Sequence, residues 1–165
     1  MTRTTAVVVG NPKPASRTLA AATYVARELS GRDAGLVVDL ATLGGRLLDW
    51  QDPGIASLVD EVGSADLVVV ACPTYKGTYT GLLKLFLDRF ATDGLSGVAV
   101  PLMLGGGPAH ALAPELTLRP VLAEIGGITV RGHYVLDSAH DDADAYAAWL
   151  DQVRPVVGAL AGVRA

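Results

Sequence analysis

Cysteine is nearly absent from this sequence, in which Cys72 is the only one among 165 residues. A single cysteine cannot form an internal disulfide, and its position at the end of an apolar run favours a small buried side chain over a reactive thiol. Charge is also scarce, with 18% charged residues and a formal net charge of −4. Because there is no basic stripe, the sequence does not resemble a protein that binds nucleic acid electrostatically.

Long apolar runs are missing as well, since none reaches the roughly 18 residues that cross a bilayer. We therefore expect no membrane span. Residues 1–5 lead into an apolar segment without the hydrophobic region of a secretory signal, which predicts a cytosolic protein. The sequence leads us to assign no metal site and no catalytic acid or base.

The sequence does contain an alternation of apolar strands with amphipathic helices. Hydrophobic residues make up 50% of the chain, and the uninterrupted apolar run at 67–72 is typical of a strand covered on both faces. Strands are expected at 6–9, 36–40, 66–72, 98–104 and 128–136. Helices are expected from residue 17, at 54–62, 80–90 and 110–125, and over a last stripe at 146–160. Pro114 and Pro120 should kink or divide the fourth helix.

This alternation predicts an α/β fold, a three-layer doubly wound sandwich around a five-stranded parallel sheet. We expect one domain over residues 1–165, and at this size the flavodoxin-like strand order 2-1-3-4-5 is favoured. Ligands of such sheets bind beyond the carboxyl ends of the strands. The sequence has its unusual loops after strands one, three and four, at 10–18, 72–80 and 105–110.

The first of these loops has the composition of an anion site. It joins a buried strand to a helix that Ser16 can cap, so free amide groups and the positive end of the helix dipole meet at one point. The donors expected to surround that point are Asn11, Lys13, Ser16, Arg17 and Thr18. The loop lacks both GxxxxGK[ST] and GxGxxG, and its hydroxyl groups suit a terminal phosphomonoester better than a pyrophosphate. The alternative is an ordinary strand-to-helix turn with solvated basic residues.

The second and third loops have the composition expected around a flat ligand. A planar polar ring can lie against backbone amides and a tyrosine in the second loop, whose candidate residues are Pro73, Thr74, Tyr75, Lys76, Gly77 and Thr78. In the third loop, Gly105, Gly106 and Gly107 allow close approach to the main chain, although a flexible turn would have the same composition. His110 is either a proton donor at the ligand edge or a structural histidine.

Three segments in this order resemble the NAD(P)H-dependent FMN reductases of the flavodoxin-like fold. Residues 10–18, GNPKPASRT, are similar to the family's GSPR-x-x-SR[ST] phosphate loop. Residues 73–84, PTYKGTYTGLLK, are similar to P-x-YK-x-x-YSG-x-LK, and residues 101–110, PLMLGGGPAH, to PLATGG-x-x-AH. The runs LRPVL at 118–122 and VLDS at 135–138 extend the similarity, which spans about residues 6–140. It is greatest to the branch that supplies reduced flavin to two-component alkanesulfonate monooxygenases.

The resemblance implies that FMN places its phosphate in the first loop and its isoalloxazine ring between the second and third. Hydride would come from NADPH or NADH, and a flavin-dependent monooxygenase would be a partner. Because the flavin supplies the chemistry, no acid or base of the protein is required for hydride transfer. Asn11 replaces the usual Ser of the family. Leu116 stands where the branch often has a Tyr associated with releasing the flavin, so we expect Leu116 to favour a flavin that stays bound.

Two other functions are compatible with the sequence. One is a quinone, azo-dye or metal-ion reductase with permanently bound FMN, and the other, from a different class, is a flavodoxin-type electron carrier. Such carriers are commonly more acidic than this chain.

We also expect a homodimer or homotetramer, because the fourth helix has leucines where the outer helix of a monomer would have charges. The expected contact residues are Leu112, Leu116 and Leu122.

Overall fold

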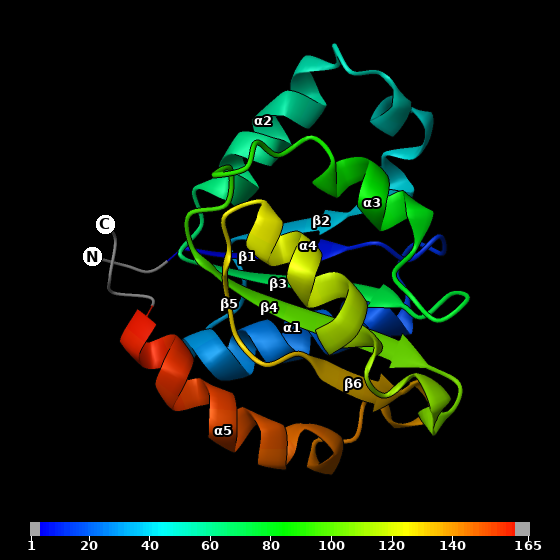
Figure 1. Ribbon diagram of the computed structural model, residues 1–165, viewed down its shortest axis with the longest axis vertical. Coiled ribbons are helices and arrows are strands. Elements are labelled where there is room, and N and C mark those ends of the chain that lie inside the picture. The colour runs from blue at the N-terminus through cyan, green and yellow to red at the C-terminus, as the bar shows by residue number, and fades with distance from the viewer. Residues whose placement is uncertain (1–3, 161–165) are drawn as a thin grey trace.

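A computed structural model describes residues 4–160, which are built around a central parallel sheet (Figure 1). The strand order is β2-β1-β3-β4-β5, with β6 also paired to β4, and all pairs are parallel. The predicted α/β fold with order 2-1-3-4-5 is confirmed. The predicted domain also includes residues 1–3 and 161–165, which lie outside the described residues. The strands are β1 (Thr5–Val9), β2 (Leu36–Asp39), β3 (Leu67–Pro73), β4 (Val98–Gly105), β5 (Ile128–Thr129) and β6 (His133–Leu136).

Helices cover both faces of this sheet (Figure 1). Side chains alternate along each strand, so one set of β1 residues, Val7 and Val9, faces two helices, and the other set, Ala6 and Val8, faces three. All four side chains are buried, as expected for a parallel sheet with two covered faces. The first pair of helices is α1 (Arg17–Ser30) and α5 (Asp144–Leu160), and the opposite three are α2 (Pro53–Gly63), α3 (Gly81–Leu87) and α4 (Arg119–Glu124).

Local capping signals set the ends of the helices beside the sheet edge. Ser16 caps α1 by accepting from the N–H of Leu19, and Gly31 ends the helix in the left-handed conformation with φ 76°. Thr80 caps α3 in the same way. That helix ends at Leu87, earlier than the expected residue 90.

The prediction of one continuous strand over 128–136 is wrong, because two short strands, β5 and β6, pair with β4 instead. The carbonyl of Ala99 accepts from Val130, so alternate residues of β4 face this edge. Pro101 is the next residue on that side and has no N–H to donate. Within the break, the Trp149 indole donates to the carbonyl of Arg131, which points away from β4.

The fourth helix is divided, as its prolines predict. A 3₁₀ turn (Pro108–His110) is followed by one π-helical turn (Pro114–Leu118) and then by α4. The wider turn places the Glu115 carboxylate against the N–H of Gly132, inside the break between β5 and β6. Arg119 donates to the other oxygen of Glu115 at 2.8 Å, so the divided helix satisfies backbone that the sheet leaves unpaired.

Cys72 lies in β3 with its side chain buried, as expected. Burial raises the pKa of its thiol to about 12, so the thiol stays protonated at neutral pH. This residue is therefore part of the core below the second loop and not a nucleophile. Among the described residues, no helix combines the length and apolar character needed to cross a bilayer.

His133 connects β6 to α5. Its ring stacks on Trp149 at 4.7 Å between centroids, and Nε2 lies 2.9 Å from the carbonyl of Ala145. Burial, helped by the nearby Arg131 charge, lowers the pKa of His133, although the contact with Ala145 opposes this shift.

A lowered folded-state pKa makes the unfolding free energy depend on pH. As pH falls through about 6.5, the unfolded chain protonates His133 before the folded protein does, so stability falls. We expect urea unfolding at pH 7.5 and 5.5 to show a smaller loss of stability for His133→Phe, which retains an aromatic ring, than for the wild type. An equal loss in both proteins would contradict this account of His133.

Candidate functional site

The first loop, which joins β1 to the first turn of α1, is held against the start of α3. The N–H of Gly10 donates to the carbonyl of Ala71 at 2.8 Å, and the buried Thr80 hydroxyl donates to the carbonyl of Gly10 at 2.6 Å. A side chain at position 10 would overlap the Cβ atom of Leu83. Glycine is therefore required for this close approach, which joins the first loop to the second.

Asn11 shapes the first loop from both ends of its amide. Its Nδ2 group donates to Thr18 Oγ1 at 3.0 Å, and its Oδ1 atom accepts from the N–H of Lys13 at 2.9 Å. Ala15 adopts a left-handed φ of 50°, and its N–H donates to Asp39 at the end of β2. The loop is thus fixed by side chains before any ligand is considered.

Two hydroxyl groups lie in or below this loop at the N-terminus of α1. Ser16 Oγ accepts from the N–H of Leu19, and Thr18 Oγ1 accepts from Asn11, so each hydroxyl keeps its own proton for donation. Both residues are buried. The first turn of α1 has no acidic residue, so the positive end of the helix dipole is not offset there.

The two cations of the first loop are in different states. Arg17 donates to the carboxylate of Asp137, 2.6 Å away in the segment that follows β6. Lys13 is exposed and makes no ion pair with the described residues. Of the predicted phosphate donors, Lys13 alone therefore offers an uncompensated charge.

The second loop is a tight hairpin. Tyr75 and Thr78 exchange backbone hydrogen bonds of 2.9 and 3.2 Å. Between them Lys76 and Gly77 both have positive φ, 53° and 82°, as in a type I′ turn. The turn leaves the Tyr75 ring 52% exposed at the rim. At its base, Thr74 Oγ1 is buried and has no hydrogen-bond partner within residues 4–160.

The third loop rests on Tyr134 of β6. The Tyr134 hydroxyl donates to the carbonyl of Gly107 at 2.6 Å, and a side chain at position 105 would overlap that hydroxyl. Positions 106 and 107 have open space where a side chain would start. This loop therefore has an occupied inner side and an accessible outer one.

The second and third loops meet at His110 and at the carbonyl of Leu104. The N–H of Thr74 donates to that carbonyl at 2.6 Å. His110 lies 4.0 Å from the point where a side chain of Gly77 would begin. All three loops consequently form one surface at the carboxyl edge of the sheet, as their positions after β1, β3 and β4 require.

Comparison with known proteins shows the family of this chain. Residues 4–141 match the family model described as NADPH-dependent FMN reductase. The chain belongs to this family. A solved structure of an NADH:FMN oxidoreductase, EMOB, in its apo form superimposes with a TM-score of 0.84 at 31% identity, over 94% of this chain and 88% of that one.

Two curated relatives within or near the FMN reductase family differ in their named acceptors. The FMN reductase (NADPH) of Escherichia coli K12 is 31% identical over 123 residues, which are 72% of this chain and 64% of the relative. An FMN-dependent NADPH-azoreductase of Staphylococcus haemolyticus is 29% identical over 158 residues, 88% of this chain and 83% of that protein. The match to the first relative thus covers slightly less than two thirds of its length.

The residues predicted for FMN lie on the three loops or at the adjoining ends of the elements beside them, where Pro73 ends β3, Gly105 ends β4, and Arg17 and Thr18 begin α1. They are Asn11, Lys13, Ser16, Arg17, Thr18, Pro73, Thr74, Tyr75, Lys76, Gly77, Thr78, Gly105, Gly106 and Gly107. Two of these residues already bond other side chains in the structure. Arg17 is paired with Asp137, and Thr18 lies beneath the loop as the partner of Asn11.

Sequence reasoning missed three side chains that hold the loops, Asp39, Thr80 and Tyr134. Thr80 directly precedes a helix, so its role as N-cap could be predicted from the sequence. Asp39 follows a strand at the edge where ligands bind. No local signal indicates that Tyr134 lies under the third loop, because that contact joins segments 27 residues apart.

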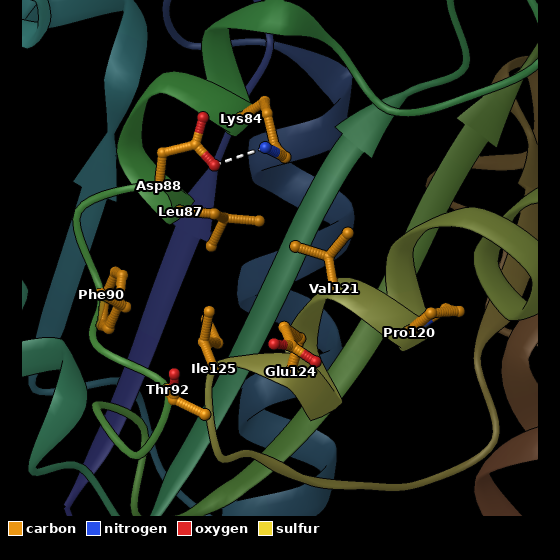
Figure 2. Close-up of a pocket in the computed structure, with 9 residues that line it drawn as sticks. All are labelled: Lys84, Leu87, Asp88, Phe90, Thr92, Pro120, Val121, Glu124 and Ile125. Atoms are coloured by element: carbon orange, nitrogen blue, oxygen red, sulfur yellow. Dashed lines mark hydrogen bonds and ion pairs between the residues drawn. The ribbon is translucent and has the colours of Figure 1, made fainter.

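A pocket of about 430 Å³ lies elsewhere, between the end of α3 and α4 (Figure 2). It shares no lining residue with the three loops. Leu87, Phe90, Val121 and Ile125 give it apolar walls, and Lys84 is paired with Asp88 at its rim. Nothing in the family resemblance depends on this pocket.

The support of the third loop by Tyr134 can be tested by substitution at neighbouring glycines. We expect Gly105→Ala to lower the unfolding free energy by about 1–3 kcal/mol, because the new methyl group displaces the Tyr134 hydroxyl. Gly106→Ala is the matched control and should change it little, since that position is open. Denaturant unfolding measures both. Equal effects at the two positions would contradict the packing described here.

Proposed function

We propose that this chain is an NAD(P)H-dependent FMN reductase, which transfers hydride from a nicotinamide to FMN. The observation that supports this most is the meeting of an anion-binding loop and two backbone-lined loops at one sheet edge. The donor set fits FMN, because it combines the Lys13 charge, helix N–H groups, two hydroxyl protons and the partnerless Thr74 hydroxyl. We propose residues 1–165 as one FMN-binding domain.

The first loop would hold the FMN phosphate. A dianion there would receive charge from Lys13 and hydrogen bonds from Ser16 and from the amides at the start of α1. Asn11 and Thr18 would contribute by keeping the loop in shape, with further hydrogen-bond capacity toward the phosphate. Arg17 would contribute only when Asp137 releases it.

The isoalloxazine ring would lie between the second and third loops. Thr74 has an unpaired hydroxyl there, and the outer sides of Gly106 and Gly107 are accessible, so flat polar edges find donors and acceptors without side-chain obstruction. Pro73, Lys76 and Thr78 would complete the second loop around the ring. The flavin supplies hydride acceptance when bound, and the protein's own groups bind and orient it.

The nicotinamide is either NADPH or NADH in this proposal. NADPH differs from NADH by a 2′-phosphate, which could be met by Lys13, Lys76, Arg46 or no fixed charge, and Arg46 is already held by both carboxylate oxygens of Asp52 at 2.8 and 2.9 Å. Lys13 and Lys76 make no such pair and are the remaining candidates. Comparing NADPH and NADH oxidation by Lys76→Ala with wild type would separate a role in coenzyme choice from one in flavin binding.

The final acceptor distinguishes the proposed roles. We propose that the chain supplies reduced FMN to a partner monooxygenase, in the cytosol. The second candidate is an azo-dye or quinone reductase with bound FMN, which the name of the staphylococcal relative favours. NAD(P)H oxidation measured with and without added FMN, together with the visible spectrum of the purified protein, decides between them. A chain that carries flavin but oxidises neither nicotinamide would be an electron carrier instead.

We further propose a homodimer or homotetramer. Leu112 and Leu116, next to and within the π-helical turn, are 65% and 69% exposed. The inclusion of Leu122 in the contact is wrong, because its side chain is fully buried in the core against the sheet. Since the Leu116 side chain is mostly exposed in its own chain, its predicted effect on flavin retention would have to act through such a contact.

The phosphate site is tested with two flavins. Removing one charge-assisted contact from a phosphate should weaken binding about tenfold. We therefore expect Lys13→Ala, alone and combined with Ser16→Ala, to weaken FMN while leaving riboflavin, which has no phosphate, nearly unchanged. Fluorescence titration measures both affinities. The single variant is needed because Ser16 also caps α1. Equal loss of both flavins would refute the assignment.

The oligomer contact is tested by charge. Leu112→Asp with Leu116→Asp should lower the mass measured by light scattering at micromolar concentration, because burying two carboxylates in an apolar contact is costly. Leu48→Asp is the control, since Leu48 is exposed to a similar degree on a different part of the chain. A monomeric wild-type protein would overturn the proposal.

A further inference from the structure

Arg17 stands at the border of the first loop but faces another element. It is the first residue of α1, directly after the capping Ser16. One guanidinium nitrogen donates to Asp137 Oδ2 at 2.6 Å, across 120 positions of sequence. Asp137 begins the short 3₁₀ turn that follows β6. The ion pair therefore connects the loop after β1 to the segment after β6, along the edge that carries the proposed FMN site.

This ion pair can open. The side chains of Arg17 and Asp137 are 61% and 42% exposed, and exposed pairs of this kind contribute little to stability. The contact also uses a single nitrogen of a group that has five N–H donors. A phosphate dianion is a stronger partner for a guanidinium than one partly solvated carboxylate. Neither side chain has another ion pair among the described residues.

We propose that Asp137 sets the affinity for FMN by competing with the FMN phosphate for Arg17. With the pair closed, Lys13 is the only free cation of the first loop, and FMN is held weakly enough to exchange. When Asp137 is neutralised, Arg17 turns to the phosphate and FMN binds more tightly. This inference rests on the proposed phosphate site, and it makes Asp137 a determinant of whether the flavin behaves as a substrate or as a resident group.

Two other acids, one at the end of β2 and one in the segment after β6, do not fit this role. Asp39 accepts from the backbone N–H of Ala15 and not from a cation. Asp141 is highly exposed and lies 3.7 Å from His140. Asp141→Asn therefore removes the same charge from the same connecting segment without touching Arg17, and it serves as the matched control.

The test compares FMN and riboflavin affinities of the full chain by fluorescence titration. Asp137→Asn should tighten FMN about fivefold, as expected for release of an exposed ion pair, and leave riboflavin unchanged. Arg17→Ala should abolish this gain, so the double variant should bind FMN like Arg17→Ala alone. Asp141→Asn should match the wild type.

Three results would overturn the proposal. One is unchanged FMN affinity in Asp137→Asn. Another is a gain that persists in the Arg17→Ala background, which would indicate simple repulsion between Asp137 and the phosphate. The third is equal tightening of riboflavin. Lys13→Ala is measured in parallel: if it weakens FMN selectively while Asp137→Asn has no effect, the phosphate site stands and only the competition is wrong. If Lys13→Ala has no effect either, the phosphate site itself is wrong.

Discussion

The contact between Gly10 and the start of α3 determines the geometry of the whole sheet edge. The Thr80 hydroxyl both caps α3 and donates to the carbonyl of Gly10, so one side chain joins the first loop to the second. This is possible only because residue 10 has no Cβ atom to meet Leu83. This contact fixes the position of the N–H groups at the start of α1 relative to the hairpin after β3.

Most of the fold was predictable because its signals are local. Apolar runs without polar interruption identify strands buried on both faces, and Ser16, Thr80 and Pro114 mark where helical segments begin. The break between β5 and β6 also has a local signal, because Pro101 inside the buried strand β4 lacks the N–H that the sheet hydrogen bonds need there. What the sequence could not show is which side chains bond the backbone within the break. The answers, Glu115 and Trp149, come from two different helical segments packed on opposite faces of the sheet.

The candidate site, like the fold, has a part that the sequence predicts and a part that it does not. The residue types on each loop follow from what a phosphate and a planar ring need, and those loops meet because parallel strands end at one edge. The partners that adjust the site are distant in sequence. The sequence offers Arg17 as a phosphate ligand but does not show that Asp137 pairs with it. In the same way, it suggests Leu122 at the surface, whereas the helix turns that side chain inward. Long-range pairing of this kind has no local pattern to reveal it.

The surroundings of the proposed flavin site hold few groups suited to proton or electron chemistry of their own. The Cys72 thiol is buried and stays protonated, and the tyrosine under the third loop is engaged with the carbonyl of Gly107. The groups proposed to bind and orient the flavin are mainly hydroxyls, backbone amides and the Lys13 charge. With the chemistry left to the flavin, differences in acceptor among relatives must arise where the site is open. In this chain the open parts of the proposed site are the rim of the second loop, at Tyr75 and Lys76, and the outer side of Gly106 and Gly107, because the buried side is already fixed by its packing.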